Sequence, residues 1–307
     1  MFNSQNVLAD MPVQATFKPW DSHALTTSKS SKAVKIEVFT DPFSAESWAM
    51  EPVLRKLELH YGDLIEFRYR MMGLVVSWEE YETSGKGTRE DMADQWENLS
   101  GPDSMPLGSK ALVDNMLHSS YPACIAFKAA ELQSPKLAKV YLRRLREMLF
   151  VEGVNIARWK NLKRAAREVG LDVDVLLLQY NNGDGLKAFL NDQKLAREKF
   201  IDEAPTIKVA ATAEGSTLPV IVSGMRNWDE MKGYISQVLD QNDLELENPS
   251  NALECFSKFR SLSTVELQTL MDREDDGLEG ELVELEEKGK LISFGCESGR
   301  IWHFIQQ

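Results

Sequence analysis

The sequence has few cysteines, and the three that are present lie far apart. Cys124, Cys255 and Cys296 form no C-x-x-C pair and show no spacing that is typical of a metal site. Cysteines of cytoplasmic proteins are normally reduced. We therefore expect three free thiols, no bound metal and a cytoplasmic location. Because free cysteine is usually buried, we expect Cys124 to be a buried helix residue.

The sequence also lacks long apolar runs and a surplus of positive charge. No run approaches the roughly 20 apolar residues that span a bilayer. Residues 1–17 show neither the basic nor the apolar region of a secretory signal. The formal net charge is −13 and the pI is about 4.9. Such a chain is repelled by nucleic acid and by anionic membranes, so we expect neither of them as a partner.

The sequence does contain a strong βαβ signal near its start. Val34–Phe39 is a β-branched and aromatic run, which predicts a buried strand. Leu64–Met71 is a second run of this kind, and a helical pattern that ends at Gly62 separates the two. A strand, a helix and a strand within about 40 residues form a βαβ unit, so we expect a parallel strand pair.

The helix of this unit begins with the sequence SAESWAMEP. Ser44 is suited to cap the helix, because its hydroxyl can accept a hydrogen bond from a free backbone N–H. Glu46 in the first turn favours the helix dipole. Pro52 lies inside the helical pattern and should bend the helix, because proline removes a backbone donor and clashes with the preceding turn.

The middle of the chain is predicted to be almost entirely helical. Glycine and proline residues separate six segments with helical apolar spacing. We expect these helices at 88–99, 120–132, 136–149, 156–169, 172–180 and 185–200. The block is long for a crossover, so we interpret 86–200 as a helical subdomain inserted into an α/β domain of residues 33–85 and 201–240.

The α/β domain is predicted to end with a hairpin and a helix. Pro205–Ala211 and Leu218–Ser223 form the hairpin with an AEGS turn, so the sheet should be mixed. Helix Asn227–Leu239 closes the domain. Residues 241–250 are interpreted as an acidic linker, and residues 1–32 as a flexible N-terminal arm.

Residues 251–307 predict a small separate module whose element order resembles a winged helix. The expected elements are helices Ala252–Arg260, Thr264–Met271 and Leu278–Lys288, followed by strands Leu291–Phe294 and Arg300–Phe304. A DNA-binding winged helix needs lysine and arginine on its third helix. The corresponding stretch here is DREDDGLEGELVELEEKGK, which would repel phosphates. We therefore expect a module that docks protein or packs on the chain itself.

The span from Lys35 to Leu239 resembles the DsbA family of thioredoxin-fold proteins. It is most similar to the branch that includes FrnE-like dithiol-disulfide isomerases and the YjbH/SpxH ClpXP adaptors. The matching pieces are FTDPFSAESWAMEPVLRKLE, IEFRYRMMGLVVSWEEY, SSYPACIAFKAAELQ, YLRRLREMLFVEGVNI and APTIKVA. The resemblance implies an α/β, DsbA-like thioredoxin fold with a large helical insertion, to which the small C-terminal winged-helix-like module is added.

The family's active motif, D-P-x-C-x-x-C-W, is altered in this chain. Ser44 and Ser47 stand where the family has its two cysteines. Disulfide exchange requires a thiolate, and a serine hydroxyl cannot form a disulfide. The chain should therefore have no dithiol redox activity, although its family consists of disulfide oxidoreductases and isomerases. The first hypothesis is a redox-inactive member that binds peptides or protein segments, as an adaptor or chaperone does.

The resemblance also implies a binding groove at this motif. In the family, a cis-proline turn faces the start of the active helix, and a backbone edge there is free to pair with an extended peptide. We expect Trp48 and Met71 to belong to the core, and Phe43 and Trp78 to be able to line the groove. The expected groove residues are Asp41, Pro42, Phe43, Ser44, Ala45, Glu46, Ser47, Trp48, Ala204, Pro205 and Thr206.

Two alternatives remain open at this point. Kappa-class glutathione transferases and 2-hydroxychromene-2-carboxylate isomerases share the fold and carry D-x-x-S-P-x-S, in which the first serine binds the glutathione thiolate. Asp41, Ser44 and Ser47 match that spacing, whereas Ala45 replaces the proline. On this reading glutathione is a cofactor and Ser44 is catalytic. The other alternative is an oxidoreductase in which both active cysteines have been engineered to serine.

A basic run and four histidines complete the candidate residues. Arg143, Arg144 and Arg146 share a predicted helix with Lys139, and we interpret them as a solvated face, with an acidic docking site as the alternative. The histidines are dispersed, and each is expected at the surface or at a helix end rather than at a metal. They are His23, His60, His118 and His303.

Overall fold

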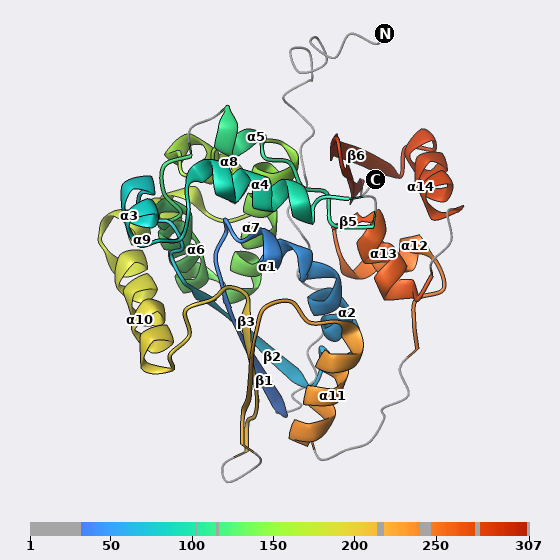
Figure 1. The fold of residues 1–307 in the computed structure, drawn as a ribbon. Helices are drawn as coiled ribbons and strands as arrows, with labels where there is room; N and C mark the ends of the chain where they lie inside the picture. The colour runs from blue at the N-terminus through green and yellow to red at the C-terminus, as the bar shows by residue number, and fades with distance from the viewer. Residues whose placement is uncertain are drawn as a thin grey trace.

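The computed structural model describes residues 32–101, 103–114, 117–213, 218–239, 247–273 and 277–305. Nearly all of the predicted N-terminal arm, most of the acidic linker and most of the AEGS turn therefore lie outside the described residues. Figure 1 shows a twisted sheet with helices packed around it and a smaller module, coloured orange to red, beside α2. Among the described residues, no helix is long and apolar enough to cross a membrane.

The larger sheet has the strand order β2-β1-β3-β4 and is mixed, as predicted. β1 and β2 pair in parallel, whereas β3 runs antiparallel to both β1 and β4. β1 is almost completely buried because it is a central strand with helices against it. The strands are β1 (Val34–Thr40), β2 (Ile65–Met71), β3 (Thr206–Ala211) and β4 (Val220–Ser223).

The helix after β1 is divided where the sequence predicts a bend. α1 (Ala45–Ala49) ends at Met50, and α2 (Glu51–Tyr61) starts directly after it. Pro52 occupies the first turn of α2, where its missing N–H leaves no intrahelical bond unmade. α11 (Trp228–Leu239) packs against α2 beside the sheet, as Figure 1 shows.

The chain between β2 and β3 contains the six predicted helices and three elements that sequence reasoning missed. The predicted ones are α4 (Arg89–Leu99), α6 (Tyr121–Gln133), α7 (Pro135–Arg146), α8 (Trp159–Glu168), α9 (Val173–Asn181) and α10 (Asp184–Glu198). The others are α3 (Trp78–Thr83), the short α5 (Lys110–Val113) and the π-helical turn η2 (Glu147–Val151), which continues α7. All five residues of η2 are buried, so tertiary packing fixes this irregular turn.

The C-terminal module has the element order of a winged helix and its own small core. Leu262, Leu267, Leu278 and Trp302 are fully buried in that core. Its second sheet has the strand order β5-β7-β6. The elements are α12 (Ala252–Lys258), β5 (Ser261–Ser263), α13 (Thr264–Met271), α14 (Gly277–Glu287), β6 (Leu291–Cys296) and β7 (Gly299–Phe304). Sequence analysis did not predict β5, because three residues are too few to show the alternation of polar and apolar side chains that is typical of a strand.

The module is docked firmly on the rest of the chain. α13 packs against α2, and the Arg55 guanidinium donates to the backbone carbonyl of Ser261 at 2.8 Å. At the tip of the β6–β7 hairpin, the Ser298 hydroxyl bonds both backbone groups of Leu107, at 2.8 and 3.0 Å. Two separate contacts therefore fix the position of the module.

Candidate functional site

Ser44 joins the start of α1 to the turn that precedes β3. Its Oγ accepts a hydrogen bond from the Ser47 backbone N–H at 3.0 Å, as expected of an N-cap. The same hydroxyl donates to the backbone carbonyl of Ala204 at 3.1 Å. The peptide bond between Ala204 and Pro205 is cis. The structure therefore brings together the two segments that the sequence placed at one site.

This site is closed rather than hollow. Of the eleven residues expected to line a groove, Glu46 alone is exposed, and the other ten are buried. Phe43 is only 1% exposed, so its ring offers little surface to a partner. Trp78 is half-buried, and its indole N–H donates to the Leu117 carbonyl. Trp48 and Met71 are fully buried, which confirms them as core residues.

Asp41 is the hydrogen-bonding centre beneath the motif. Its carboxylate accepts from the backbone N–H groups of Phe43 and Leu74 at 2.8 Å each, and from Ser120 Oγ at 2.9 Å. The Cys124 thiol donates to it at 3.3 Å. Burial raises the pKa of Asp41, although the hydrogen bonds oppose this effect. Asp41 therefore holds the β1–α1 turn against the loop after β2 and against α6.

The Cys124 thiol beside the motif is held in its protonated form. Cys124 is fully buried, as predicted, and burial together with the adjacent Asp41 carboxylate raises the pKa of its thiol well above the ordinary value. A thiol in this state is not a nucleophile. Ser47 is also buried, and its Oγ has no hydrogen-bond partner among the described residues. The site therefore contains two hydroxyls but no thiolate.

Comparison with known proteins identifies the architecture. The model of a protein family described as Thioredoxin matches residues 38–233. The chain belongs to this thioredoxin family. The likeness extends to solved structures. One described as a candidate protein disulfide isomerase from Nitrosomonas europaea superposes with a TM-score of 0.52 at 15% identity, covering 68% of this chain and 96% of that one. At this identity the likeness concerns the fold.

Relatives of this thioredoxin-family chain extend over almost its whole length. A protein from Halalkalibacterium halodurans is 29% identical over 282 residues, which are 91% of each chain. A protein from Bacillus subtilis is 28% identical over 277 residues, which are 88% of this chain and 89% of that protein. Both are named ClpXP adapter protein SpxH. The similarity thus includes the C-terminal module as well as the thioredoxin fold.

The rim of the closed site carries features that sequence reasoning missed. Glu46 and Glu203 are exposed, and neither carboxylate has a cationic partner among the described residues. Partial burial raises the pKa of Glu46, and the charge of Glu203 raises it further. Phe200 and Met225 flank the same turn and are 93% and 45% exposed. No local motif marks these residues, because the fold alone places them around Pro205.

The basic run on α7 is a buried ionic network, so its interpretation as a solvated face is wrong. The Arg143 guanidinium bonds both carboxylate oxygens of Glu266 in the C-terminal module, at 2.9 Å each. Arg146 bonds Glu51 of α2 at 2.7 Å. Arg55 adds a second ion pair to Glu266 at 2.8 Å. Arginine can be buried in this way because carboxylates satisfy its planar donors.

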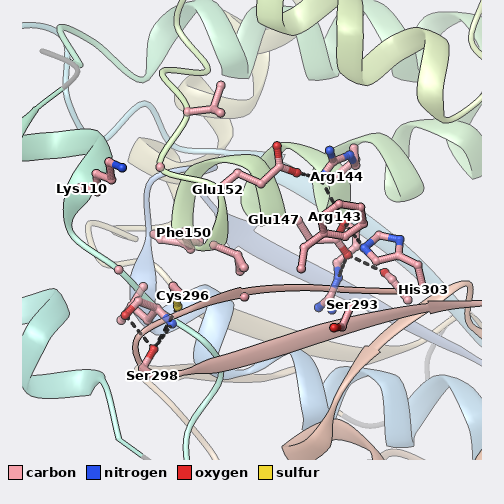
Figure 2. Close-up of a pocket in the computed structure, with 18 of the residues that line it drawn as sticks. Lys110, Arg143, Arg144, Glu147, Phe150, Glu152, Ser293, Cys296, Ser298 and His303 are labelled. Atoms are coloured by element: carbon pink, nitrogen blue, oxygen red, sulfur yellow. Dashed lines mark hydrogen bonds and ion pairs between the residues drawn. The ribbon is translucent and has the colours of Figure 1, made fainter. Parts of the chain in front are cut away.

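A large cleft beside this network contains the remaining charged groups of the junction. The cleft has a volume of about 1690 Å³. Figure 2 shows Arg144 and Glu147 of the helical subdomain on one side and His303 and Ser293 of the module on the other. Arg144 pairs with Glu152 at 2.5 Å. The described residues contain no group of side chains suited to hold a metal ion.

His303 was expected at the surface or at a helix end, but the structure buries it in β7. Burial lowers the pKa of His303 to about 4; Glu147 opposes this effect, and the neighbouring arginines reinforce it. Burial alone would raise the pKa of Glu147, but protonated His303 and the arginines Arg143 and Arg144 bring it down to about 2. At neutral pH the pair is therefore a neutral imidazole beside a carboxylate.

Proposed function

We propose that this chain is a redox-inactive adaptor that brings a protein partner to a ClpXP-type protease. The observation that carries the proposal concerns the Ser44–Pro205 site, called the thiol site below because the resembled family has its two cysteines there. In this chain Ser44 bonds Ala204, and Ser47 stands at the position of the second cysteine. Relatives named ClpXP adapter protein SpxH support it, because they align over about nine-tenths of both chains. The three cysteines are unpaired, which supports a cytoplasmic location.

We place the partner-binding surface at the rim of the Ser44–Pro205 site rather than inside it. The interior is filled, whereas Phe200 and Met225 offer exposed apolar area. Glu46 and Glu203 are two carboxylates that repel one another, and a cation would relieve that repulsion. The rim therefore suits a partner segment that combines lysine or arginine with apolar side chains.

The adaptor role is tested with ClpXP from the source species, assembled with a ClpP variant that traps substrates without cleaving them. Proteins captured in the presence and absence of this chain are compared by mass spectrometry. We expect a small set whose capture rises about tenfold, equivalent to about 1.4 kcal/mol of binding free energy. Identical captured sets with and without the chain would contradict the proposal.

The rim is tested by charge reversal in the same assay. Glu46→Lys combined with Glu203→Lys should abolish most of the gain in capture, since both positions are exposed. The matched control is Glu82→Lys with Glu287→Lys, which changes the net charge equally at exposed sites on α3 and α14. Equal loss in both double variants would show a general effect of charge instead of a binding surface.

The redox-inactive claim is tested separately. We expect no insulin reduction by the chain, because neither hydroxyl can attack a disulfide. Turnover in that assay would contradict the claim. The variant with Ser44→Cys and Ser47→Cys shows whether the scaffold still supports dithiol chemistry, which is the expected result if the serines replace cysteines of an active oxidoreductase.

Glutathione binding has less support than protein binding. The Ser44 hydroxyl already bonds Ala204, and the unpaired carboxylates of Glu46 and Glu203 would repel the carboxylates of glutathione. We therefore expect calorimetric titration with glutathione to show no binding. Binding that Ser44→Ala removes would favour a glutathione-dependent transferase or isomerase instead.

A further inference from the structure

A second groove lies at the domain junction, away from the thiol site. It has a volume of about 450 Å³ and runs between α7 and the segment Lys258–Ser261 of the module. Its other end reaches Phe67 of β2 and Gly62 at the end of α2. Val140 and Arg260 also line the larger cleft of Figure 2, so the two hollows adjoin each other. A volume of this size accommodates one or two large side chains.

The interior of this groove is apolar and aromatic. Leu54, Ile65, Tyr69 and Phe259 line it, and each is less than a tenth exposed. Phe67 is half-buried, and the Lys139 ammonium lies 4.8 Å from the centre of its ring. Such a lining favours the insertion of an apolar side chain, which is how buried anchor residues supply most of the affinity at an interface.

The groove is positively charged, although the chain as a whole is acidic. Seven lysine and arginine side chains line it against three glutamates, Glu51, Glu58 and Glu131. The formal net charge of the chain is −13. The adjoining cleft shows no such excess, since five cationic and six acidic side chains line it. Of these two hollows, the groove is therefore the one with an excess of cationic lining residues.

Two of the cations at the groove are free to meet a partner. Arg55 and Arg143 are committed to Glu266, and Lys139 pairs with Glu58. Lys136 in the first turn of α7 and Lys258 at the end of α12 are both exposed, and neither has an ion-pair partner among the described residues. The two lysines stand on the two domains that form the groove.

We propose that this groove docks a short segment of a partner protein in which an aromatic or large aliphatic anchor is flanked by acidic residues. The anchor fills the apolar interior, and the acidic residues pair with Lys136 and Lys258 at the rim. The proposal is independent of the adaptor role and of the rim around Pro205.

The experiment uses the full chain and two fluorescein-labelled peptides, GEDLWDEG and its uncharged counterpart GQNLWNQG, which offers no cation to the Glu46–Glu203 rim. Fluorescence anisotropy at low salt should show binding of the acidic peptide and at least about tenfold weaker binding of the uncharged one. Raising the salt concentration should weaken the acidic complex, because the lysines are exposed. Equal affinity for both peptides, or no binding of either, overturns the proposal.

Matched variants locate the binding. Lys136→Glu with Lys258→Glu should weaken binding of the acidic peptide about tenfold or more, whereas Lys86→Glu with Lys187→Glu, at exposed positions on other faces, should leave it unchanged. Phe67→Ala should also weaken binding by shrinking the apolar wall. Circular dichroism checks that each variant is folded. Equal affinities of the two charge-reversed variants overturn the assignment.

Self-association is the main competing occupant, because α14 is acidic. Light scattering at several protein concentrations distinguishes the two cases. A monomer that binds the acidic peptide supports the proposal. A dimer that the acidic peptide does not dissociate, but that Lys136→Glu with Lys258→Glu does, shows that a second copy occupies the groove and overturns it. Neither result alters the outcome of the ClpP trapping assay.

Discussion

The thiol site and the domain junction both bury polar groups, but they satisfy them by different means. Around Ser44 the partners are hydroxyls, backbone groups and one carboxylate, that of Asp41, which accepts from backbone N–H groups, a hydroxyl and a thiol. At the junction, Arg143 and Arg146 face Glu266 and Glu51 in a network of full charges. The first region holds hydroxyls at the two positions where disulfide exchange would need thiols, while the second joins the C-terminal module to the rest of the chain through charges that neither part could bury alone.

The comparison teaches where substitution should be costly. Removing a neutral hydrogen bond leaves a modest penalty, whereas removing one member of a buried ion pair leaves an uncompensated charge. Ser44 and Ser47 should therefore tolerate substitution better than the residues of the buried ion pairs at the junction. The following substitutions test this order, from the largest expected effect to the smallest.

Glu266→Ala should be the most damaging change, because Arg143 and Arg55 both depend on this fully buried carboxylate. We expect a loss of about 3–5 kcal/mol in the free energy of unfolding, measured by urea denaturation. Glu287→Ala, at an exposed position of α14, is the control and should have little effect. A loss below about 1 kcal/mol for Glu266→Ala would remove the contrast between the two regions.

Acid should weaken the junction through His303. The ordinary histidine pKa is 6.5, whereas burial lowers that of His303 to about 4 in the folded chain. As the pH falls from about 6.5 to about 4, the unfolded chain takes up a proton that the folded chain does not, and stability falls by up to about 3 kcal/mol. Glu147 adds a loss of the same sign between its ordinary pKa of 4.5 and about 2.

This pH dependence is measured by urea unfolding at several pH values. His303→Gln should flatten the curve between about pH 6.5 and 4, since glutamine does not titrate. His118→Gln, at an exposed position, is the control and should leave the curve unchanged. A wild-type curve that is already flat in this range would show that His303 protonates readily in the folded chain.

Ser44→Ala should cost about 1–2 kcal/mol of unfolding free energy, because it removes both the N-cap of α1 and the hydrogen bond to Ala204. Thermal or urea denaturation measures this loss. Ser44→Thr retains the hydroxyl and should recover part of the stability. A neutral Ser44→Ala would mean that the two segments of the site are held together by packing alone.

Ser47→Ala should have the smallest effect, within about 0.5 kcal/mol of the wild type, because the hydroxyl that it removes has no hydrogen-bond partner in the described part of the chain. Ser44 and Ser47 lie three residues apart at the same helix start, so the losses of unfolding free energy in the two alanine variants can be compared directly. A large destabilisation by Ser47→Ala would reveal a hydrogen bond that the structure does not contain.

The sequence predicted the cap at Ser44 and its meeting with the turn at Pro205, because these features are local or carried by a family motif. The capping role of Ser44 depends on residues within one helical turn, and the motif pointed to Pro205. It failed for Arg143, whose partner Glu266 is 123 positions away. The sequence also did not predict the burial of Phe43, because the exposure of a residue at a helix start depends on what packs over it. Local residue spacing predicts neither the position of a distant ion-pair partner nor the segments that cover a side chain.

The unequal bonding of the two motif serines makes the two positions unequal for substitution by cysteine. Oxygen at position 44 ties α1 to the turn before β3, so sulfur there would replace two hydrogen bonds with weaker ones. Oxygen at position 47 makes no hydrogen bond in the described part of the chain. Cysteine should therefore be accommodated more readily at position 47 than at position 44.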